Sequence, residues 1–497
     1  MQPNQPSIAQ LEQAARGGNE MARLELGNRL LIEHPPGSAE SERGLEMLRQ
    51  AAAGAQGPAA QWLLGGFYLQ NLSFPDGLSQ ARHWMGLAAE AGVGPALDRM
   101  ANLHLRDLDG GFEPERALEL LQRLADAGFQ RAAWEVGYLT STLDALVDPG
   151  GAVSAFARAC ALSYPPAYYS LGLRFALGAG VQADPGFARA LLLRAADAGF
   201  PDARAAADEL APAGGATAAD SWYDALKRNH AEAGGLLQQL GDGGMLIPAQ
   251  RLQAIDGLEA HFAGLGHPAL GISADGRLQV EAGPARVFRA EPADWHWLCD
   301  RPRVATSAGF VSREERSHVM FMVVGGLEAP EKYTSSSVNG AYENQYFSGT
   351  GKNFGALSSD AVVRCIERRI AERTDWRADA LEPSSVICYS PGQEYRPHVD
   401  YFSQQQIADN RARTRDFGGQ RVVTFLICLQ GAEAGGETCY PRVDLKVEHR
   451  AGTAMLHYNT LPDGQPDEMS QHHGMPVERG EKWLLRTTLR AHGRYAG

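Results

Sequence analysis

Three side chains near the C-terminal end of the chain could together hold a metal ion. His398 and Asp400 lie two positions apart, and His472 follows much later in the sequence. On an extended strand, residues two apart leave the same face, so His398 and Asp400 can approach one ion. Two imidazoles and one carboxylate hold one face of Fe(II) and leave the other coordination positions for a chelating acid and O2. The pattern predicts a 2-His-1-carboxylate iron site.

A cation follows this set at a short interval. Lys482 comes ten residues after His472, and a fixed ammonium there can pair with the far carboxylate of a 2-oxo dicarboxylic acid. Taken singly, each signal is weak, because a His-x-Asp pair can arise by accident and a lysine is usually solvated. His473 is an alternative ligand to His472, but on a strand its side chain would point to the other face. The order and spacing of the whole set make the prediction specific.

Four sequence blocks carry a resemblance to a known family. They read Tyr-x-x-Gly-x-x-Tyr-x-x-His-x-Asp, Gln-Arg-x-x-Thr, Gly-Gly-Glu-Thr and His-x-x-x-Pro-Val-x-x-Gly-x-Lys-Trp, at residues 389–400, 420–424, 435–438 and 472–483. All four occur in this order in the prolyl 4-hydroxylase branch of the 2-oxoglutarate/Fe(II) dioxygenases, which the segment resembles. The match covers roughly the last 200 residues of the chain.

The resemblance implies a role for each matching residue. It implies three iron ligands: His398, Asp400 and His472. It implies three residues that hold 2-oxoglutarate: Tyr389, Thr438 and Lys482. It implies two residues that face the substrate: Tyr395 and Arg421. The implied reaction uses O2, converts 2-oxoglutarate to succinate and CO2, and hydroxylates a C–H bond, with L-ascorbate keeping the iron reduced.

One departure from the family pattern concerns the substrate. Thr488 stands where peptide-acting members often carry a second Trp that lines the substrate groove. We therefore keep three hypotheses: hydroxylation of a prolyl residue in a protein, hydroxylation of a small molecule or another residue type, and an adaptor or sensor whose oxygenase domain is inactive. Arg486 shares a strand face with Lys482, so it is either a partner of the metal site or a surface arginine.

Composition excludes some functions for the whole chain. The 497 residues carry a net charge of −13, which argues against nucleic-acid binding through a basic surface. The first residues contain no basic segment followed by an apolar run, and no apolar run approaches the roughly 20 residues that span a bilayer. Six scattered cysteines without paired spacing predict reduced thiols in a cytoplasmic protein. We expect no nucleic-acid and no membrane partner.

The first two-fifths of the chain are repetitive. A small residue followed four positions later by alanine recurs at Gly18/Ala22, Gly92/Ala96, Gly128/Ala132, Ser163/Ala167 and Gly199/Ala203. A period of about 36 residues with two helices per unit predicts an α-solenoid over residues 7–212. The pattern resembles Sel1-like repeats, which are related to tetratricopeptide repeats. The solenoid is expected to bind a protein or peptide partner, although a purely structural scaffold is the alternative.

The rest of the chain divides into a connector and an oxygenase domain. Residues 213–285 are expected to form a linker and a connector packed on the catalytic domain, with helices at 221–240 and 248–263 and a hairpin at 272–280. Residues 286–497 are expected to form a double-stranded β-helix, or jelly roll. Helices at 312–323 and 359–373 should cover its sheet, and the strands are expected at 385–389, 422–429, 453–457 and 483–489.

Two polar loops complete the expectation. Residues 401–419 carry Arg411, Arg413 and Arg415 and are interpreted as a lid or substrate loop beside the metal, with a solvated surface loop as the alternative. Residues 333–355 are rich in Ser, Asn and Gly and are interpreted as a mobile flap over the substrate.

Overall fold

The computed structural model describes residues 6–72, 74, 76–108, 111–211, 271–272, 278–279, 282–284, 289–324, 327, 347–355, 358–413 and 418–493. The expected linker at 213–220, the helices at 221–240 and 248–263, and most of the expected flap lie outside these residues.

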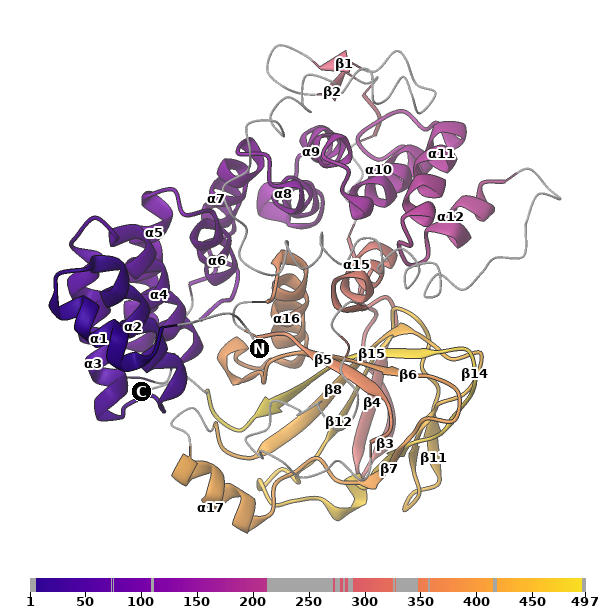
Figure 1. The fold of residues 1–497 in the computed structure, drawn as a ribbon. Helices are drawn as coiled ribbons and strands as arrows, with labels where there is room; N and C mark the ends of the chain where they lie inside the picture. The colour runs from indigo at the N-terminus through magenta and orange to yellow at the C-terminus, as the bar shows by residue number, and fades with distance from the viewer. Residues whose placement is uncertain are drawn as a thin grey trace.

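The N-terminal part of the chain is a succession of helix pairs, drawn from indigo to magenta in Figure 1. Its helices are α1 (Ile8–Arg16), α2 (Glu20–Glu33), α3 (Ala39–Ala52), α4 (Gly57–Gln70), α5 (Gly77–Glu90), α6 (Gly94–His104), α7 (Pro114–Asp126), α8 (Gln130–Thr142), α9 (Pro149–Ala161), α10 (Pro165–Leu177), α11 (Pro185–Asp197) and α12 (Ala203–Glu209). The predicted α-solenoid is confirmed.

The small residues of the repeat have two separate structural reasons. Those that start each repeated pair, such as Gly128 at φ 84° and Gly199 at φ 78°, adopt the left-handed conformation between two helices. Gly137, inside α8, has a different reason, because a Cβ there would lie 2.7 Å from the ring of Phe156 on α9. The absence of a side chain lets the two helices of a pair touch.

The C-terminal part is built on antiparallel sheets. In the described residues, the major sheet has seven strands in the order β3 (His296–Asp300), β4 (Arg303–Ser307), β12 (Ala454–Tyr458), β8 (Arg421–Gln430), β15 (Lys482–Arg490), β6 (Ser385–Tyr389) and β5 (Thr350–Asn353). The minor sheet has four, in the order β11 (Leu445–Val447), β10 (Thr438–Tyr440), β13 (His472–Gly474) and β7 (Tyr395–His398). A short pair joins β14 (Val477–Arg479) to β9 (Ala434–Gly435). The predicted jelly-roll fold is confirmed.

The two faces of the major sheet have different partners. Its inner face packs against the minor sheet around Ile387, Leu426 and Tyr440, and this core encloses the predicted metal site. Its outer face packs against α15 (Arg313–Val323) and α16 (Ala361–Thr374), which lie between the sheet and the repeats in Figure 1. The hydrophobic core on this outer side continues without interruption into the repeat helices. The two halves of the chain therefore share one core.

Buried charges also join the halves. Tyr138 of α8 donates a hydrogen bond to Glu315 of α15 at 2.7 Å, and Arg369 of α16 pairs with the same carboxylate at 2.7 Å. Arg174 of α10 pairs with Glu314 at 2.7 Å, and both side chains are at most 2% exposed. The repeats therefore pack against the oxygenase helices through paired charges as well as apolar surface.

Several sequence expectations need correction. The expected loop at 401–419 contains a helix, α17 (Gln404–Arg413), because Ser403 and Gln406 cap its first turn reciprocally. The end of the expected flap is not a loop, since residues 350–353 form the edge strand β5. The hairpin of β1 (Gly271–Ile272) and β2 (Leu278–Gln279) forms as expected, but this part of the connector lies on the repeats: β2 contacts α9, and Gly180 donates a hydrogen bond to the carbonyl of Pro284 at 2.9 Å.

Two features of the whole chain bear on the sequence analysis. All six cysteines are free thiols, as the scattered spacing predicted. None of the helices in the described part of the chain has the length and apolar character needed to cross a bilayer.

Candidate metal centre

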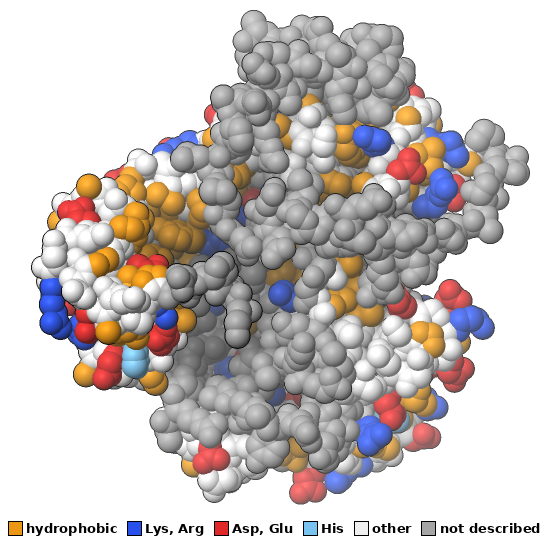
Figure 2. Space-filling view, in the orientation of Figure 1, with side chains coloured by type: hydrophobic (Ala, Val, Ile, Leu, Met, Phe, Trp, Pro, Cys, Tyr) orange, Lys and Arg blue, Asp and Glu red, His pale blue; other side chains and the backbone are white. Residues whose placement is uncertain are grey.

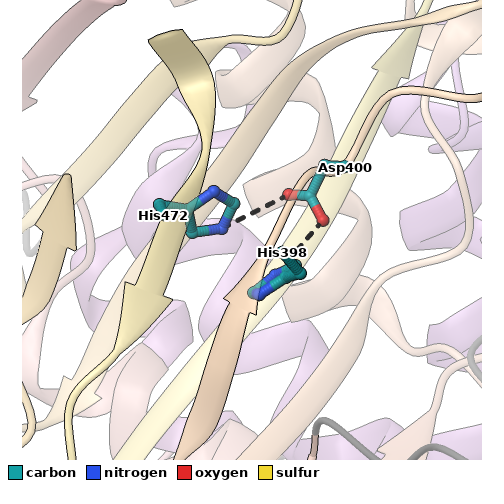
Figure 3. Close-up of side chains that lie close together, drawn as sticks. All are labelled: His398, Asp400 and His472. Atoms are coloured by element: carbon teal, nitrogen blue, oxygen red, sulfur yellow. Dashed lines mark ion pairs between the residues drawn. The ribbon is translucent and has the colours of Figure 1, made fainter. Parts of the chain in front are cut away.

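The structure brings His398, Asp400 and His472 together at the mouth of the jelly roll (Figure 3). His398 ends β7 and faces His472 of β13 directly in the antiparallel register, while Asp400 follows β7 by two residues. One ligand atom from each residue lies within 4.8 Å of the others. The Nε2 atoms of His398 and His472 lie 3.7 Å and 3.8 Å from the two carboxylate oxygens of Asp400. These separations leave space for an ion between the three groups.

The hydrogen bonds of the two imidazoles fix which nitrogen faces that space. Nδ1 of His398 lies 2.7 Å from the carbonyl of Arg396, and Nδ1 of His472 lies 3.0 Å from the carbonyl of Ser470. Because a carbonyl only accepts, each Nδ1 carries the proton and each Nε2 presents a lone pair. Two lone pairs and a carboxylate then face one another, which is unfavourable unless a cation lies between them. The donor set therefore fits Fe(II).

Electrostatics keep the three groups in the form that binds metal. Burial lowers the pKa of His472 well below its usual range, and the neighbouring imidazoles lower it further. Burial alone would raise the pKa of Asp400, but the Arg486 guanidinium and the imidazoles lower it well below its usual range. The site thus presents neutral imidazoles and an ionised carboxylate, the states that coordinate a metal.

Residues around Asp400 hold its carboxylate in place. Thr424 donates a hydrogen bond to Oδ2 of Asp400 at 2.6 Å, and Asn459 donates to Thr424 at 3.0 Å. Arg486 lies 3.6 Å from Oδ1 and is only 12% exposed, so it is a neighbour of the site and not a surface arginine. A network of this kind orients a metal-binding carboxylate before the ion arrives.

Sequence reasoning did not identify His457, the histidine behind the site. It is fully buried on β12, its Nδ1 lies 2.7 Å from the hydroxyl of Tyr440, and its Nε2 lies 3.6 Å from Oδ2 of Asp400. Alternation along the strand could have indicated it, because Met455 and His457 share the face that points into the barrel. No family block marked the position.

Lys482, the predicted anchor of the far carboxylate, is buried at the start of a central strand. It begins β15 opposite Tyr389 of β6, and its ammonium lies 4.7 Å from the centre of the Tyr389 ring. The ammonium donates a hydrogen bond to the carbonyl of Gly436 at 2.7 Å, and the side chain is almost completely buried. Burial lowers the pKa of Lys482 to about 8.

Thr438 and a second unassigned histidine stand near this lysine. The hydroxyl of Thr438 lies 2.7 Å from Nε2 of His449. Lys482 and His449 line one cavity of about 270 Å³ together with residues 432–437 and 448–450. A cavity lined by a buried cation, with the Thr438 hydroxyl bonded to a histidine of its wall, suits the far carboxylate of 2-oxoglutarate.

The remaining predicted residues differ in how they relate to the site. Tyr395 stacks on the ring of His398 at 3.6 Å between ring centres.

Arg421 does not join the group: its guanidinium is buried against Glu382 in two hydrogen bonds of 2.7 Å and 2.8 Å, so its predicted place facing the substrate needs correction. His473 points away from the triad, with Nε2 3.9 Å from Glu394, as expected for its alternate position on the strand. Thr488 is buried.

Comparison with known sequences identifies the family. The sequence model of the 2OG-Fe(II) oxygenase superfamily matches residues 384–489. Probable prolyl 4-hydroxylase 3 from Arabidopsis thaliana is 31% identical over 204 residues, which cover 37% of this chain and 67% of the relative. The chain belongs to the prolyl 4-hydroxylase family. Another family member, prolyl 4-hydroxylase subunit alpha-1 from Mus musculus, is 29% identical over 207 residues, covering 41% of this chain and 38% of the relative.

Other matches cover the two halves separately. The Sel1 repeat model matches residues 58–93, 95–129 and 165–200 of this family member. Among solved structures, the viral collagen prolyl hydroxylase from Paramecium bursaria Chlorella virus-1 is 22% identical with a TM-score of 0.30, covering 39% of this chain and 99% of the other. A Sel1 repeat protein from Oxalobacter formigenes is 22% identical with a TM-score of 0.39, covering 54% and 78%. The chain is thus a 2-oxoglutarate/Fe(II) dioxygenase joined to Sel1 repeats, and its family uses Fe(II), 2-oxoglutarate and O2.

Proposed function

We propose that this dioxygenase hydroxylates a prolyl residue of a protein or peptide substrate, with Fe(II) held by His398, Asp400 and His472. The observation that carries the metal assignment is the pair of Nε2 lone pairs aimed at an ionised carboxylate, an arrangement that calls for a cation. The prolyl assignment is supported by the relatives, which are named prolyl 4-hydroxylases.

Each residue of the site has a distinct task in this proposal. Bound Fe(II) supplies the redox chemistry that couples decarboxylation of 2-oxoglutarate to hydroxylation. Lys482 pairs with the far carboxylate of 2-oxoglutarate, and Thr438 and Tyr389 are the further residues that hold the co-substrate. Thr424 and Arg486 hold the carboxylate of Asp400.

A second candidate substrate class is favoured by two observations. Thr488 replaces the groove tryptophan of many peptide-acting members, and Arg421 is engaged by Glu382. Both changes alter the surface that a peptide would meet, so hydroxylation of a small molecule or another residue type is the alternative. An inactive adaptor or sensor is disfavoured by the complete set of metal ligands together with the buried Lys482.

We also propose that a protein partner binds the repeats. Because α6, α8 and α10 pack against the oxygenase helices, the proposed docking surface lies on α1–α5. Figure 2 shows hydrophobic side chains gathered over the N-terminal helices, and Met21 and Ile32 of α2 are 56% and 73% exposed. Dependence on L-ascorbate and a cytoplasmic location remain predictions of the sequence.

The deciding experiment is turnover of 2-oxoglutarate to succinate by the purified protein with Fe(II) and L-ascorbate, with and without proline-containing peptides. We expect slow turnover alone and faster turnover with a peptide that contains the right proline. His472→Ala should abolish turnover, while His473→Ala, the adjacent histidine outside the triad, should retain it.

Two outcomes would overturn parts of the proposal. Equal activity in the His472→Ala and wild-type proteins would remove the metal assignment. Turnover that no proline-containing peptide stimulates, but that a small molecule stimulates, would favour the second substrate class.

A further inference from the structure

His449 stands beside the predicted anchor for the far carboxylate, although no family block includes it. It follows β11, whose Val447 pairs with Thr438 of β10, so the chain carries His449 past the same residue. Its Nε2 lies 2.7 Å from the hydroxyl of Thr438, and it lines the cavity of about 270 Å³ that Lys482 also lines. The histidine is therefore close to the carboxylate site without occupying it.

The hydroxyl of Thr438 has one proton, and its direction depends on His449. If the hydroxyl donates to Nε2, it presents only lone pairs to an anion. If Nε2 carries the proton and donates to the hydroxyl oxygen, the hydroxyl proton is free to donate to a carboxylate. A neutral imidazole can supply either form, because its single proton sits on either nitrogen.

The surroundings keep this imidazole neutral before an anion binds. Burial lowers the pKa of His449 well below its usual range, and the nearby Lys482 ammonium lowers it further. The ring thus has one N–H, and the arriving carboxylate selects the form in which that N–H points to Thr438.

We propose that His449 is a positioning residue for the co-substrate: it donates to Thr438 and so turns the Thr438 hydroxyl toward the far carboxylate of a 2-oxo dicarboxylic acid. This inference rests on the proposed function of Lys482 and Thr438. Lys482 supplies the charge, Thr438 supplies a directed hydrogen bond, and His449 sets its direction. The consequence is a preference for acids that carry the second carboxylate.

The test is anaerobic titration of the Fe(II) protein with 2-oxoglutarate, read by the visible charge-transfer absorption of a 2-oxo acid chelated to Fe(II). His449→Leu removes the donor, and we expect its dissociation constant to rise by about tenfold or more, the scale of one hydrogen bond to a charged group. His449→Gln keeps an N–H near the position of Nε2 and should retain most of the affinity. His449→Asn, whose shorter amide does not reach Thr438, takes the place of the leucine variant if that variant does not fold.

Two further measurements separate a positioning role from a structural one. In a Thr438→Val background, His449→Leu should cause no additional loss, because both changes remove the same hydrogen bond. With 2-oxovalerate, in which a methyl group replaces the far carboxylate, His449→Leu and wild type should bind equally.

Each result has one meaning. Wild-type protein that does not bind 2-oxoglutarate would overturn the proposed function itself. Wild-type binding with equal affinity in His449→Leu, or an equal loss for 2-oxovalerate, would overturn only the role of His449.

Discussion

Two buried groups of histidine and aspartate in the described part of the chain differ in their spacing. At the junction between the repeats and the oxygenase, Nε2 of His318 lies 2.6 Å from Asp360, and both side chains are at most 1% exposed. At the candidate metal centre, the imidazoles of His398 and His472 lie 3.7 Å and 3.8 Å from Asp400. The first group is bonded internally, whereas the second leaves its lone pairs facing a gap.

The difference lies in what completes each group. The ring of Trp134 stacks on His318 with ring centres 4.0 Å apart, and the Asp360 carboxylate also caps the first turn of α16. The His318 imidazole and the Asp360 carboxylate are thus each other's partner, which is the arrangement of a structural contact. At the metal centre the two Nε2 atoms instead face the Asp400 carboxylate at distances longer than a hydrogen bond, and the same side-chain types form a candidate binding site.

The buried cations show the same contrast. Arg174 and Arg369 at the junction each pair with a glutamate at 2.7 Å. Lys482 donates to a backbone carbonyl, and among the described residues no carboxylate lies at ion-pair distance from its ammonium, although the charge of Glu437 acts on it from farther away. A buried cation without an anion at ion-pair distance is costly for folding, and this cost is relieved when an anionic ligand binds. The junction stabilises the fold, and the barrel interior is prepared for ligands.

The largest effect is expected from breaking a junction pair. Arg174→Met leaves the Glu314 carboxylate buried without its cation, which should lower the free energy of unfolding by about 3–5 kcal/mol. Chemical denaturation measures this change. The affinity of the folded variant for Fe(II) should remain that of the wild type, because the pair lies on the far side of the major sheet.

An exposed pair in the same solenoid provides the control. Arg158 lies 2.8 Å from Asp126, whose side chain is 72% exposed, so Arg158→Ala should cost less than about 1 kcal/mol. If Arg174→Met were no more harmful than Arg158→Ala, or if it weakened Fe(II) binding, the division between a structural junction and a functional barrel would fail.

A smaller effect is expected from the residue that orients Asp400. Thr424→Val keeps the shape of the side chain but removes the hydrogen bond to Oδ2 of Asp400. Loss of such an orienting partner typically weakens metal binding by about 10- to 100-fold. Titration with Fe(II) under anaerobic conditions measures the change, and 2-oxoglutarate turnover at saturating Fe(II) should recover in part.

Thr487→Val is the matched control for this change. Thr487 is equally buried, but its hydroxyl donates to the backbone carbonyl of Glu382 at 2.8 Å. Loss of this hydrogen bond should lower the free energy of unfolding and leave the affinity for Fe(II) unchanged. Similar Fe(II) affinities in the two variants would contradict an orienting role for Thr424.

The metal site and the junction also differ in how far the sequence could predict them. His398 ends β7 and Asp400 follows two positions later, and Lys482 follows His472 closely, so short patterns contained most of the site. The junction joins residues such as Tyr138 and Glu315, which are remote in sequence and belong to no local pattern. Their pairing depends on how two folded parts meet, so spacing could not predict it.

The sequence predicted some residues of the site and missed others, again because contacts between remote residues decide where side chains lie. Backbone register determines which residues share the barrel interior, and the family blocks sample only some of those positions. His449 and His457 come close to Thr438 and Asp400 through strand pairing. Arg421 lies in a family block, yet the local partner Glu382 decides where its guanidinium points. The helix α17 had a local signal in its capping residues, which the polar composition of the segment obscured.

The smallest effect is expected from pH and tests the contrast between cations. Burial places the pKa of Lys482 near 8, so in the free protein its ammonium loses its proton as the pH rises through this value. Affinity for 2-oxoglutarate should be constant below about pH 7 and fall by up to about tenfold per pH unit above about pH 8, because only the ammonium pairs with the carboxylate.

Lys482→Arg should give a flat profile, since a guanidinium stays protonated. Binding of 2-oxovalerate, measured in parallel, corrects for any effect of pH on the metal. A wild-type profile as flat as that of the arginine variant would mean that Lys482 already has an anionic partner, as Arg174 and Arg369 do, and the contrast between the two groups of buried cations would be lost.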